Sequence, residues 1–395
     1  FSFTVLKGDQ HAKTKFSFLR AKERHYDPRK YFKDDEKHFG FFTNLKPTLI
    51  TPAIHRDRDV GNRRLLSRYN PKNDIVFHAS HGTPSWMHET LKKAIDLWSQ
   101  AFQKAGVGIK VKFDTSKTVA LNDIRYNVLN VNNSNIQNGL FGYGPRIADP
   151  LTGEIISGTA NIYLGGFRGA IAAFIRNHIE FYAQKKSKSL FIPLVDKKSL
   201  LTDLKKGELS VPTNGKFSNL NPELWVTTNH IKENCPEVSS FIERIGDTQL
   251  FESTDEELAV IESCTNSVFP IVTLPTILHE IGHVFGLRHN FKASTDLPNF
   301  MPAEVAHTQH EGRSSSIMDY FSIEDRTLYQ PGLYDIAALA FGYAERVETK
   351  QSGTFVEITD TSKSLRENFG RDSLRNFEYC SDCLLYTSPS PRDNR

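Results

Sequence analysis

The chain has 395 residues, 38% hydrophobic and 24% charged, so it is long enough to bury a real core, and a disordered or fibrous class is excluded. Lysine and arginine number 49 against 46 acidic residues, and the net charge of +3 gives no electrostatic case for a nucleic-acid partner. We find no apolar run of the roughly 18 residues that a membrane span needs. The four cysteines are too few for a disulfide-dense scaffold, and Cys235 and Cys264 can either pair or stay free.

The two ends of the sequence contribute little to the fold prediction. Residues 1–70 are basic, aromatic and rich in turn dipeptides, so we interpret them as the tail of an upstream region or a linker. Because the sequence begins at Phe1, a signal peptide can be neither read nor excluded. Residues 383–395 resemble translated sequencing-adapter read-through and are left out of the fold prediction. The C-x-x-C formed by Cys380 and Cys383 therefore has little weight as a redox or zinc motif.

Regular elements are predicted from residue 75 onward. Residues 75–79 are typical of a buried strand, and Thr83 and Pro84 predict a helix with Thr83 as N-cap and proline at the first helical position. Apolar residues spaced three or four apart continue this helix to Gly106. Alternation of apolar residues and lysines over residues 109–113 predicts a strand with one face exposed to solvent. The three elements together predict a right-handed parallel crossover.

Shorter strands complete a mixed sheet. They are expected at 124–131, 140–147 and 154–164, with a turn at 149–153. Residues 167 to about 266 begin with a predicted amphipathic helix and continue as a lysine-rich sequence interrupted by prolines. We interpret this segment as a mostly helical insertion.

A metal-binding pattern occupies residues 279–289, which read H-E-I-G-H-V-F-G-L-R-H. On a helix His279 and His283 lie one turn apart on the same face, so their imidazoles can take two corners of a tetrahedral zinc site. Glu280 lies about 100° round the helix, beside the metal, in the position of a general base for a zinc-activated water.

The third ligand comes from beyond the helix. Gly286 allows the chain to leave the helix in a left-handed conformation, which brings His289 back toward the first two histidines. Three protein ligands leave one coordination position open, as a hydrolytic zinc requires. A chance match to the whole pattern is expected in roughly 6 of 100,000 chains of this composition.

The pattern resembles the zinc-binding consensus of the metzincin metallopeptidases. Residues 314–320 resemble the methionine turn of that family, with Met318 as the methionine. The resemblance implies that Met318 forms an apolar floor under the imidazoles without binding zinc. In astacin-like and serralysin-like members a tyrosine two positions later reaches the metal or the oxyanion, which implies a catalytic role for Tyr320. The alternative is a packed tyrosine whose hydroxyl bonds to the backbone.

Further matches point to a bacterial branch of zinc-dependent metalloproteases in which a domain of unknown function precedes the peptidase. They are Leu287 to Asn290, Tyr334 to Ala337 and the turn at 149–154, and the resemblance covers about residues 70–345. Asp319 departs from the groups that carry histidine after the methionine. In metzincins the strand after this turn forms the sheet edge above the cleft, here about 157–164, where an extended peptide could bind by strand addition.

The fold class that follows is α+β: a metzincin-like catalytic domain with a twisted mixed sheet, two long helices, a zinc cleft and a smaller irregular C-terminal subdomain. We divide the chain into an upstream tail (1–70), an N-terminal catalytic subdomain (71–290) with the insertion at about 167–266, a C-terminal subdomain with the methionine turn (291–365), a C-terminal extension (366–382) and the excluded residues 383–395.

The function expected is hydrolysis of peptide or protein substrates by a zinc endopeptidase. A catalytically silent binding protein on the same scaffold is the main alternative, and loss of Glu280 would have marked it. A gluzincin-type site would use Glu304 as third ligand, which His289 makes unnecessary. A purely structural zinc lacks a fourth ligand near His289. Family resemblance alone indicates a secreted, periplasmic or cell-envelope protein, and the oligomeric state stays open.

Weaker features have bland explanations. His307 and His310 could hold a second metal, but a polar surface loop is the simpler interpretation, and the same applies to His78 and His81. The lysine-rich residues 185–188 are typical of a solvated face rather than of an anionic partner or membrane surface.

Overall fold

The computed structural model describes residues 2–7, 10–15, 25–46, 63–132, 141–186, 228–244, 255–301, 314–320, 328–350, 354–370 and 372–381. Its strands are β1 (Ser2–Lys7), β2 (Gln10–Lys15), β3 (Thr43–Lys46), β4 (Arg63–Leu66), β5 (Ile75–Ser80), β6 (Val111–Val119), β7 (Asn127–Asn132), β8 (Gly142–Tyr143), β9 (Arg146–Ala148), β10 (Ile155–Tyr163), β11 (Arg346–Glu348) and β12 (Phe355–Glu357). Its α-helices are α1 (His88–Lys104), α2 (Leu164–Lys186), α4 (Thr228–Asn234), α5 (Pro236–Arg244), α6 (Asp255–Val284), α7 (Leu333–Leu339) and α8 (Leu365–Phe369).

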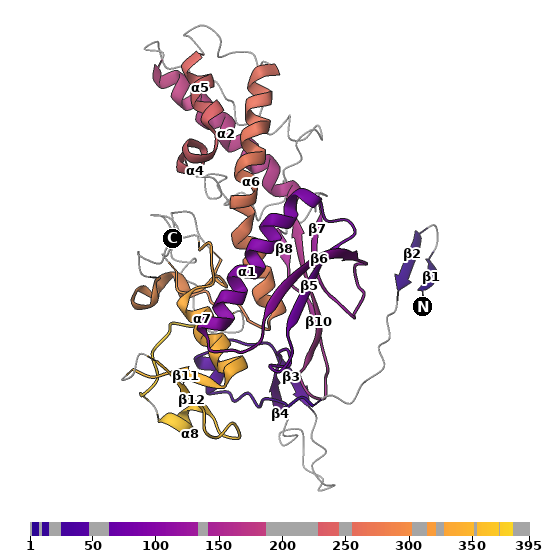
Figure 1. The fold of residues 1–395 in the computed structure, drawn as a ribbon, viewed down its shortest axis with the longest axis vertical. Coiled ribbons are helices and arrows are strands. Elements are labelled where there is room, and N and C mark those ends of the chain that lie inside the picture. Colours follow the sequence, from indigo (N-terminus) through magenta and orange to yellow (C-terminus); the bar gives the residue numbers. More distant parts are fainter. Residues whose placement is uncertain are drawn as a thin grey trace.

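A mixed sheet forms the centre of the fold, as predicted. Its strand order is β6-β5-β7-β10-β8, with β9 also paired to β10. Strand β5 is parallel to β6 and β7, and β10 is parallel to β7, whereas β8 and β9 are antiparallel to β10. The expected parallel pairing with a connecting helix is confirmed, because α1 connects the parallel strands β5 and β6 and packs on the sheet together with α6 (Figure 1).

The edge of the sheet is not the one that we predicted. We expected an edge at 157–164, but β10 has β7 on one side and both β8 and β9 on the other. The outer strand is the short β8, where Gly142 pairs with Ile162. The prediction was wrong because the pattern of residues 140–147 indicates a strand without showing that it folds back on to β10.

The start of α1 also differs from the prediction. A 3₁₀ turn, Ser85–Met87, precedes the helix, and no side chain caps it. The Thr83 hydroxyl instead donates to the carbonyl of Leu129 at 3.0 Å and accepts from the amide of Val131 at 3.1 Å. The hydroxyl is thus used to fix the neighbouring strand β7, a long-range demand that a capping pattern does not reveal.

Helix α6 is a single helix of 30 residues that begins inside the segment we interpreted as an insertion. Pro270 and Pro275 lie within it, and each removes one intrahelical hydrogen bond. Packing offsets this cost, because Val268, Phe269 and Ile277 are buried around the two prolines.

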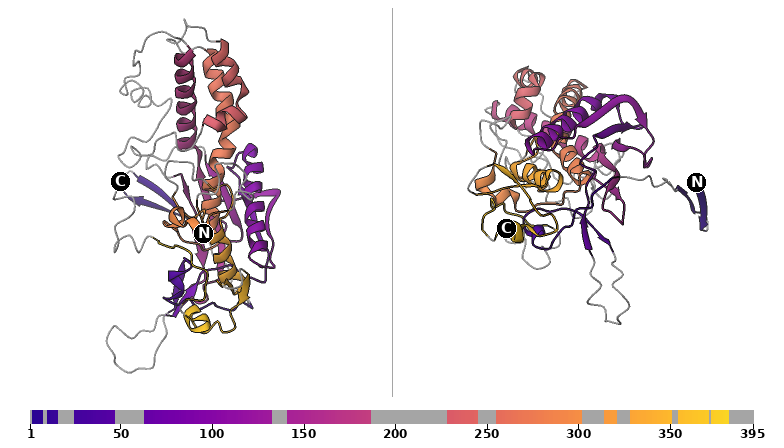
Figure 2. Two further views of the ribbon diagram at one scale, coloured as in Figure 1. Left: turned by 90° about the vertical axis from the view of Figure 1, so that its left-hand side faces the viewer. Right: turned by 60° about the horizontal axis from the view of Figure 1, so that its bottom comes forward.

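The first half of α6 forms a helical arm with α2, α4 and α5. Figures 1 and 2 show this arm extending beyond the sheet, with α2 alongside α6. A disulfide between Cys235 and Cys264 connects the junction of α4 and α5 to α6, which answers the open question about these cysteines. Ile231, Val238 and Phe241 complete the packing of the arm.

In its length and apolar composition, α6 is the one described helix that would suffice to cross a membrane, although we found no such run in the sequence. Half of the 18-residue apolar stretch of α6 is buried inside the protein. The helix also carries His279 and His283 into the interior. The same length and composition occur in the core helix of a globular protein, so this is weak evidence for a span.

Part of the segment interpreted as an upstream tail contributes to the core. Tyr31, Phe39 and Phe41 are buried against the C-terminal residues, and the ring of Phe39 stacks on Phe341 with centroids 5.1 Å apart. The amide of Gly40 donates to the hydroxyl of Tyr334 at 2.8 Å. Residues 25–46 therefore pack against the C-terminal subdomain and stabilise it.

Candidate metal centre

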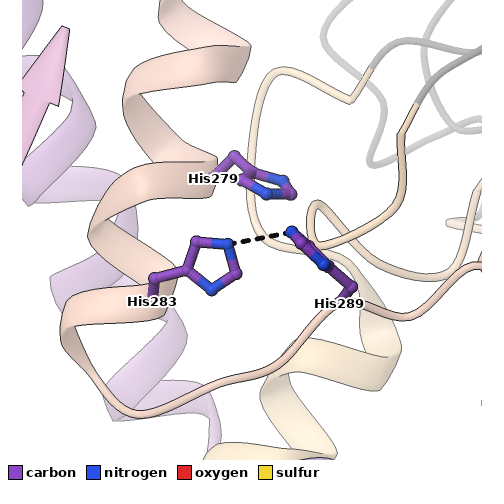
Figure 3. Close-up of side chains that lie close together, drawn as sticks. All are labelled: His279, His283 and His289. Atoms are coloured by element: carbon purple, nitrogen blue, oxygen red, sulfur yellow. Dashed lines mark hydrogen bonds between the residues drawn. The ribbon is translucent and has the colours of Figure 1, made fainter. Parts of the chain in front are cut away.

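Three histidines converge at the end of α6. His279 and His283 extend from the last turns of the helix and His289 comes from the loop that follows (Figure 3). One nitrogen from each ring lies within 4.8 Å of the others, and the Nε2 atoms of His283 and His289 are 3.1 Å apart. Two nitrogens bound tetrahedrally to one zinc ion lie about 3.3 Å apart. The spacing therefore fits a zinc ion.

Backbone carbonyls orient two of the rings. Nδ1 of His279 lies 2.9 Å from the carbonyl oxygen of Ile317, and Nδ1 of His283 lies 2.9 Å from that of Leu287. A carbonyl oxygen only accepts, so each ring donates from Nδ1 and presents the lone pair of Nε2. Burial, followed by the neighbouring His279 and His289, lowers the pKa of His283 well below its usual value, which keeps this ring neutral. His279 and His283 are therefore both oriented with the Nε2 lone pair available to bind a metal ion.

The turn that brings back His289 has the predicted left-handed glycine. Gly286 has φ +94°, and its amide donates to the carbonyl of His283 at 3.0 Å. The amide of Leu287 donates to the carbonyl of Gly282 at 3.1 Å, which completes a Schellman motif. A Cβ atom at Gly286 would overlap the carbonyl oxygen of Ser67. This position thus needs glycine both for its φ and for its space.

Glu280 lies beside the triad in a dry environment. The residue is 7% exposed, and burial raises the pKa of its carboxyl to about 8 in the protein without metal. A Cβ atom at Gly142 in β8 would overlap Oε1 of Glu280, so the outer strand passes directly over this carboxylate. Within the described part of the chain the carboxylate makes no hydrogen bond, and it is therefore available to accept a proton.

The methionine turn lies directly beneath the metal helix. Met318 is fully buried, and its sulfur would overlap a Cβ atom placed at Gly282, the fourth residue of the histidine motif. The Met318 carbonyl accepts from the amide of Asn290 at 2.9 Å. Met318 thus packs against the helix between its two histidines.

Asp335 is a supporting residue that our sequence reasoning missed. It is fully buried, and it accepts hydrogen bonds from the Ser316 hydroxyl at 2.6 Å and from the amides of Ile317 and Gly332, each at 2.7 Å. These bonds fix the segment whose Ile317 carbonyl orients His279. The Tyr334 to Ala337 match contains this aspartate, but only the tertiary structure gives it a role.

Tyr320 lies next to the triad, at the surface. Its ring centroid is 5.6 Å from that of His279 and 4.5 Å from that of His289, and 46% of the residue is exposed. The candidate catalytic tyrosine therefore lies beside the histidines with part of its side chain open to solvent.

Arg146 is a second neighbour that the sequence did not indicate. Its guanidinium lies 3.6 Å above the ring of Phe42, which in turn is 5.8 Å from the ring of His283. Burial lowers the pKa of Arg146 to about 10, and its charge contributes to keeping His283 neutral. Residue 146 falls near the end of the strand expected at 140–147, and nothing in that pattern separates it from a surface arginine.

The weaker candidates do not join the site. His78 lies 3.5 Å from Asp114, and His81 bonds to the Thr118 hydroxyl at 2.8 Å, so neither belongs to a metal cluster. Within the described ranges, the triad is the one group of histidine, cysteine and acidic side chains spaced for a metal ion. Glu304, His307, His310 and Cys383 lie outside the residues that the structure describes.

Together, the mixed sheet, the histidine-bearing helix, the glycine turn and the buried methionine define a metzincin-like fold with a three-histidine zinc site. Residues 275–378, which include the three histidines and the methionine turn, match the family model described as Met-zincin. Neither the curated proteins nor the solved structures contain a match to this chain.

Proposed function

We propose that this protein is a zinc-dependent endopeptidase. The observation that carries the proposal is the combination of two imidazoles oriented by backbone carbonyls with Glu280, a carboxylate that has no described hydrogen bond, on the next residue of the same helix. A structural zinc site needs four protein ligands and no base. Three ligands and an available base instead favour hydrolysis.

His279, His283 and His289 would hold the zinc ion. Bound there, zinc supplies Lewis acidity that activates water and polarises the carbonyl of the scissile bond. Glu280 takes the proton of the attacking water at its carboxylate and delivers it to the leaving amine. Its buried position strengthens it as a base, since desolvation disfavours the ionised form. The Tyr320 hydroxyl is the candidate donor to the oxyanion.

The substrate we propose is an extended peptide. Strand β8 lies at the outer end of the sheet order and passes over Glu280 at Gly142. A peptide that adds to this strand would place its backbone alongside the general base. Backbone recognition of this kind suits cleavage within a chain rather than at its end.

We also propose an extracytoplasmic location. The pairing of Cys235 with Cys264 supports it, because disulfides persist in oxidising compartments and are rare in reducing ones. Mass spectrometry of the protein from its native source, alkylated before reduction, tests this point. Alkylation of both cysteines would contradict it.

The decisive experiment compares the parent with Glu280→Gln and with His283→Ala. Zinc content is measured by elemental analysis, and cleavage is measured with an unbiased peptide library. We expect near-stoichiometric zinc in the parent and Glu280→Gln, much less in His283→Ala, and cleavage by the parent alone. Loss of Glu280 should reduce kcat about 10²- to 10⁴-fold.

Two outcomes would overturn the proposal. Zinc in the parent without cleavage of any library member favours a binding protein on the same scaffold. Equal cleavage by the parent and Glu280→Gln shows that another group, or a contaminating protease, is responsible. Sensitivity of the parent activity to a chelator, restored by added zinc, separates these cases.

A further inference from the structure

A pocket apart from the metal centre is lined by residues 27–29, 68, 70–72, 343–345 and 361. Its volume is about 410 Å³, within the range of small-molecule sites. Its charged lining residues come from three parts of the chain and are Asp27, Arg29, Arg68, Lys72 and Glu345. None of the three histidines lines it, so the pocket is separate from the metal centre.

Arg29 is the unusual member of this pocket. It is only 3% exposed, and its Nε and Nη1 atoms are sealed from solvent without a hydrogen-bond partner. Its third nitrogen, Nη2, has no hydrogen bond to the described residues and is not among the sealed atoms. The face of the guanidinium packs over the ring of Phe341, 5.1 Å from its centroid. A buried cation with so little compensation is destabilising unless an anion completes it.

The nearby acids already have other partners. Asp35 accepts from the amide of Leu365 at 2.8 Å, and Glu345 pairs with Arg68 at 3.3 Å. Asp27 pairs with Lys72 at 3.0 Å. Three cationic side chains therefore face two carboxylates in the lining, and among the described residues Arg29 is the cation of the three without a side-chain hydrogen bond or ion pair.

We propose that this pocket binds a small oxyanion, a carboxylate or a phosphate, opposite Arg29. Lys72, whose side chain is 63% exposed, stands at the mouth and attracts the anion, while Arg68 lies 2% exposed in the wall. The site is tied to the metal helix, because the hydroxyl of Tyr343 donates to the carbonyl of Phe285 at 2.8 Å. An occupied pocket thus stabilises the residues that support the turn at Gly286.

Thermal unfolding of the full chain, loaded with zinc, tests the proposal. The probes are sodium acetate and inorganic phosphate, each titrated against sodium chloride at constant ionic strength and pH. For the parent we expect a saturable rise of Tm by about 2 °C at ten times the dissociation constant. The probe with the lower dissociation constant shows whether the pocket prefers a carboxylate or a phosphate.

Arg29→Met should abolish the saturable rise without lowering Tm in chloride, because it removes a buried cation whose Nε and Nη1 atoms have no hydrogen-bond partner. Arg125→Met is the matched control, since Arg125 is exposed and pairs with Asp123 at 2.6 Å. It should keep the full response. If Arg29→Met does not fold, Lys72→Met replaces it and should raise the dissociation constant several-fold.

Repeating the titration after chelation separates this pocket from the zinc site, where oxyanions also bind. The response should persist in the metal-free protein. The proposal is wrong if the parent shows no saturable response, if Arg29→Met and Lys72→Met both respond as the parent does, or if chelation abolishes the response. None of these outcomes bears on peptide cleavage, so the proposed endopeptidase function is judged separately.

Discussion

The carbonyl of Ile317 and Nδ1 of His279, 2.9 Å apart, connect the methionine turn directly to the metal helix. The two residues are 38 positions apart in the sequence. This contact sets the tautomer of the first ligand, and it depends on how the loop is held. The carboxylate of Asp335 holds that loop through three donors.

Asp335→Asn should weaken zinc binding without touching a ligand. The amide replaces one accepting oxygen with a donor, which then faces backbone amides that also donate. We expect the free energy of unfolding to fall by about 2–4 kcal/mol and zinc affinity to fall about 10- to 100-fold. Denaturant unfolding and competitive chelation measure the two quantities. Asp96→Asn, at an exposed site on α1, is the control, and unchanged affinity in Asp335→Asn would contradict the role.

Gly286→Ala separates backbone strain from steric overlap when it is compared with Gly370→Ala. Both glycines have positive φ, +94° and +82°, but Gly370 has open space around it whereas Gly286 faces the Ser67 carbonyl. We expect Gly370→Ala to lower the free energy of unfolding by about 1 kcal/mol and Gly286→Ala by about 3 kcal/mol. Only Gly286→Ala should lose zinc. Equal costs would show that the contact with Ser67 is unimportant.

Gly142→Ala should impair the general base while leaving the metal in place. The added methyl group overlaps Oε1 of Glu280 and forces the carboxylate or β8 to move. We expect kcat/KM for a cleaved peptide to fall about 10- to 100-fold with zinc content unchanged. Gly108→Ala, where nothing lies within 4 Å, should be active. A fully active Gly142→Ala would place the substrate and base elsewhere.

The stability of the metal-free protein should depend on pH through Glu280. Burial raises the pKa of this carboxyl from 4.5 to about 8 in the folded state. Between these values the folded state holds more protons than the unfolded state, so stability is full below pH 4.5 and falls as pH rises through 8. Glu280→Gln lacks this term. The difference in unfolding free energy between the two chelated proteins should therefore grow by a few kcal/mol from pH 5 to pH 8. A difference that stays constant would show that Glu280 is solvated.

Removal of the disulfide should loosen the helical arm. Cys235 and Cys264 enclose a separation of 29 residues, and loss of such a crosslink costs about 3 kcal/mol. We expect the double variant Cys235→Ala/Cys264→Ala to unfold at lower denaturant than the parent and to be insensitive to reductant. A parent that is equally insensitive would show that the bond is not formed.

The sequence by itself determined the local parts of the site. Helical spacing puts His279 and His283 on one face and Glu280 beside them, because 3.6 residues per turn requires it. The left-handed turn at Gly286 was predictable from the sequence, because few residues other than glycine adopt this conformation. The strand, helix and strand of residues 75–119 follow from the same kind of short-range periodicity.

Only the tertiary structure decided which distant groups complete the centre. It placed Asp335 behind the methionine turn, Gly142 over Glu280, and residues 25–46 beneath the end of α6. It also placed β8 at the outer edge of the sheet. The Thr83 hydroxyl, predicted to cap a helix, instead bonds to the neighbouring strand β7. These contacts join residues far apart in the chain, and periodicity and capping describe only neighbours, so the distances that matter are settled when the sheet and helices pack.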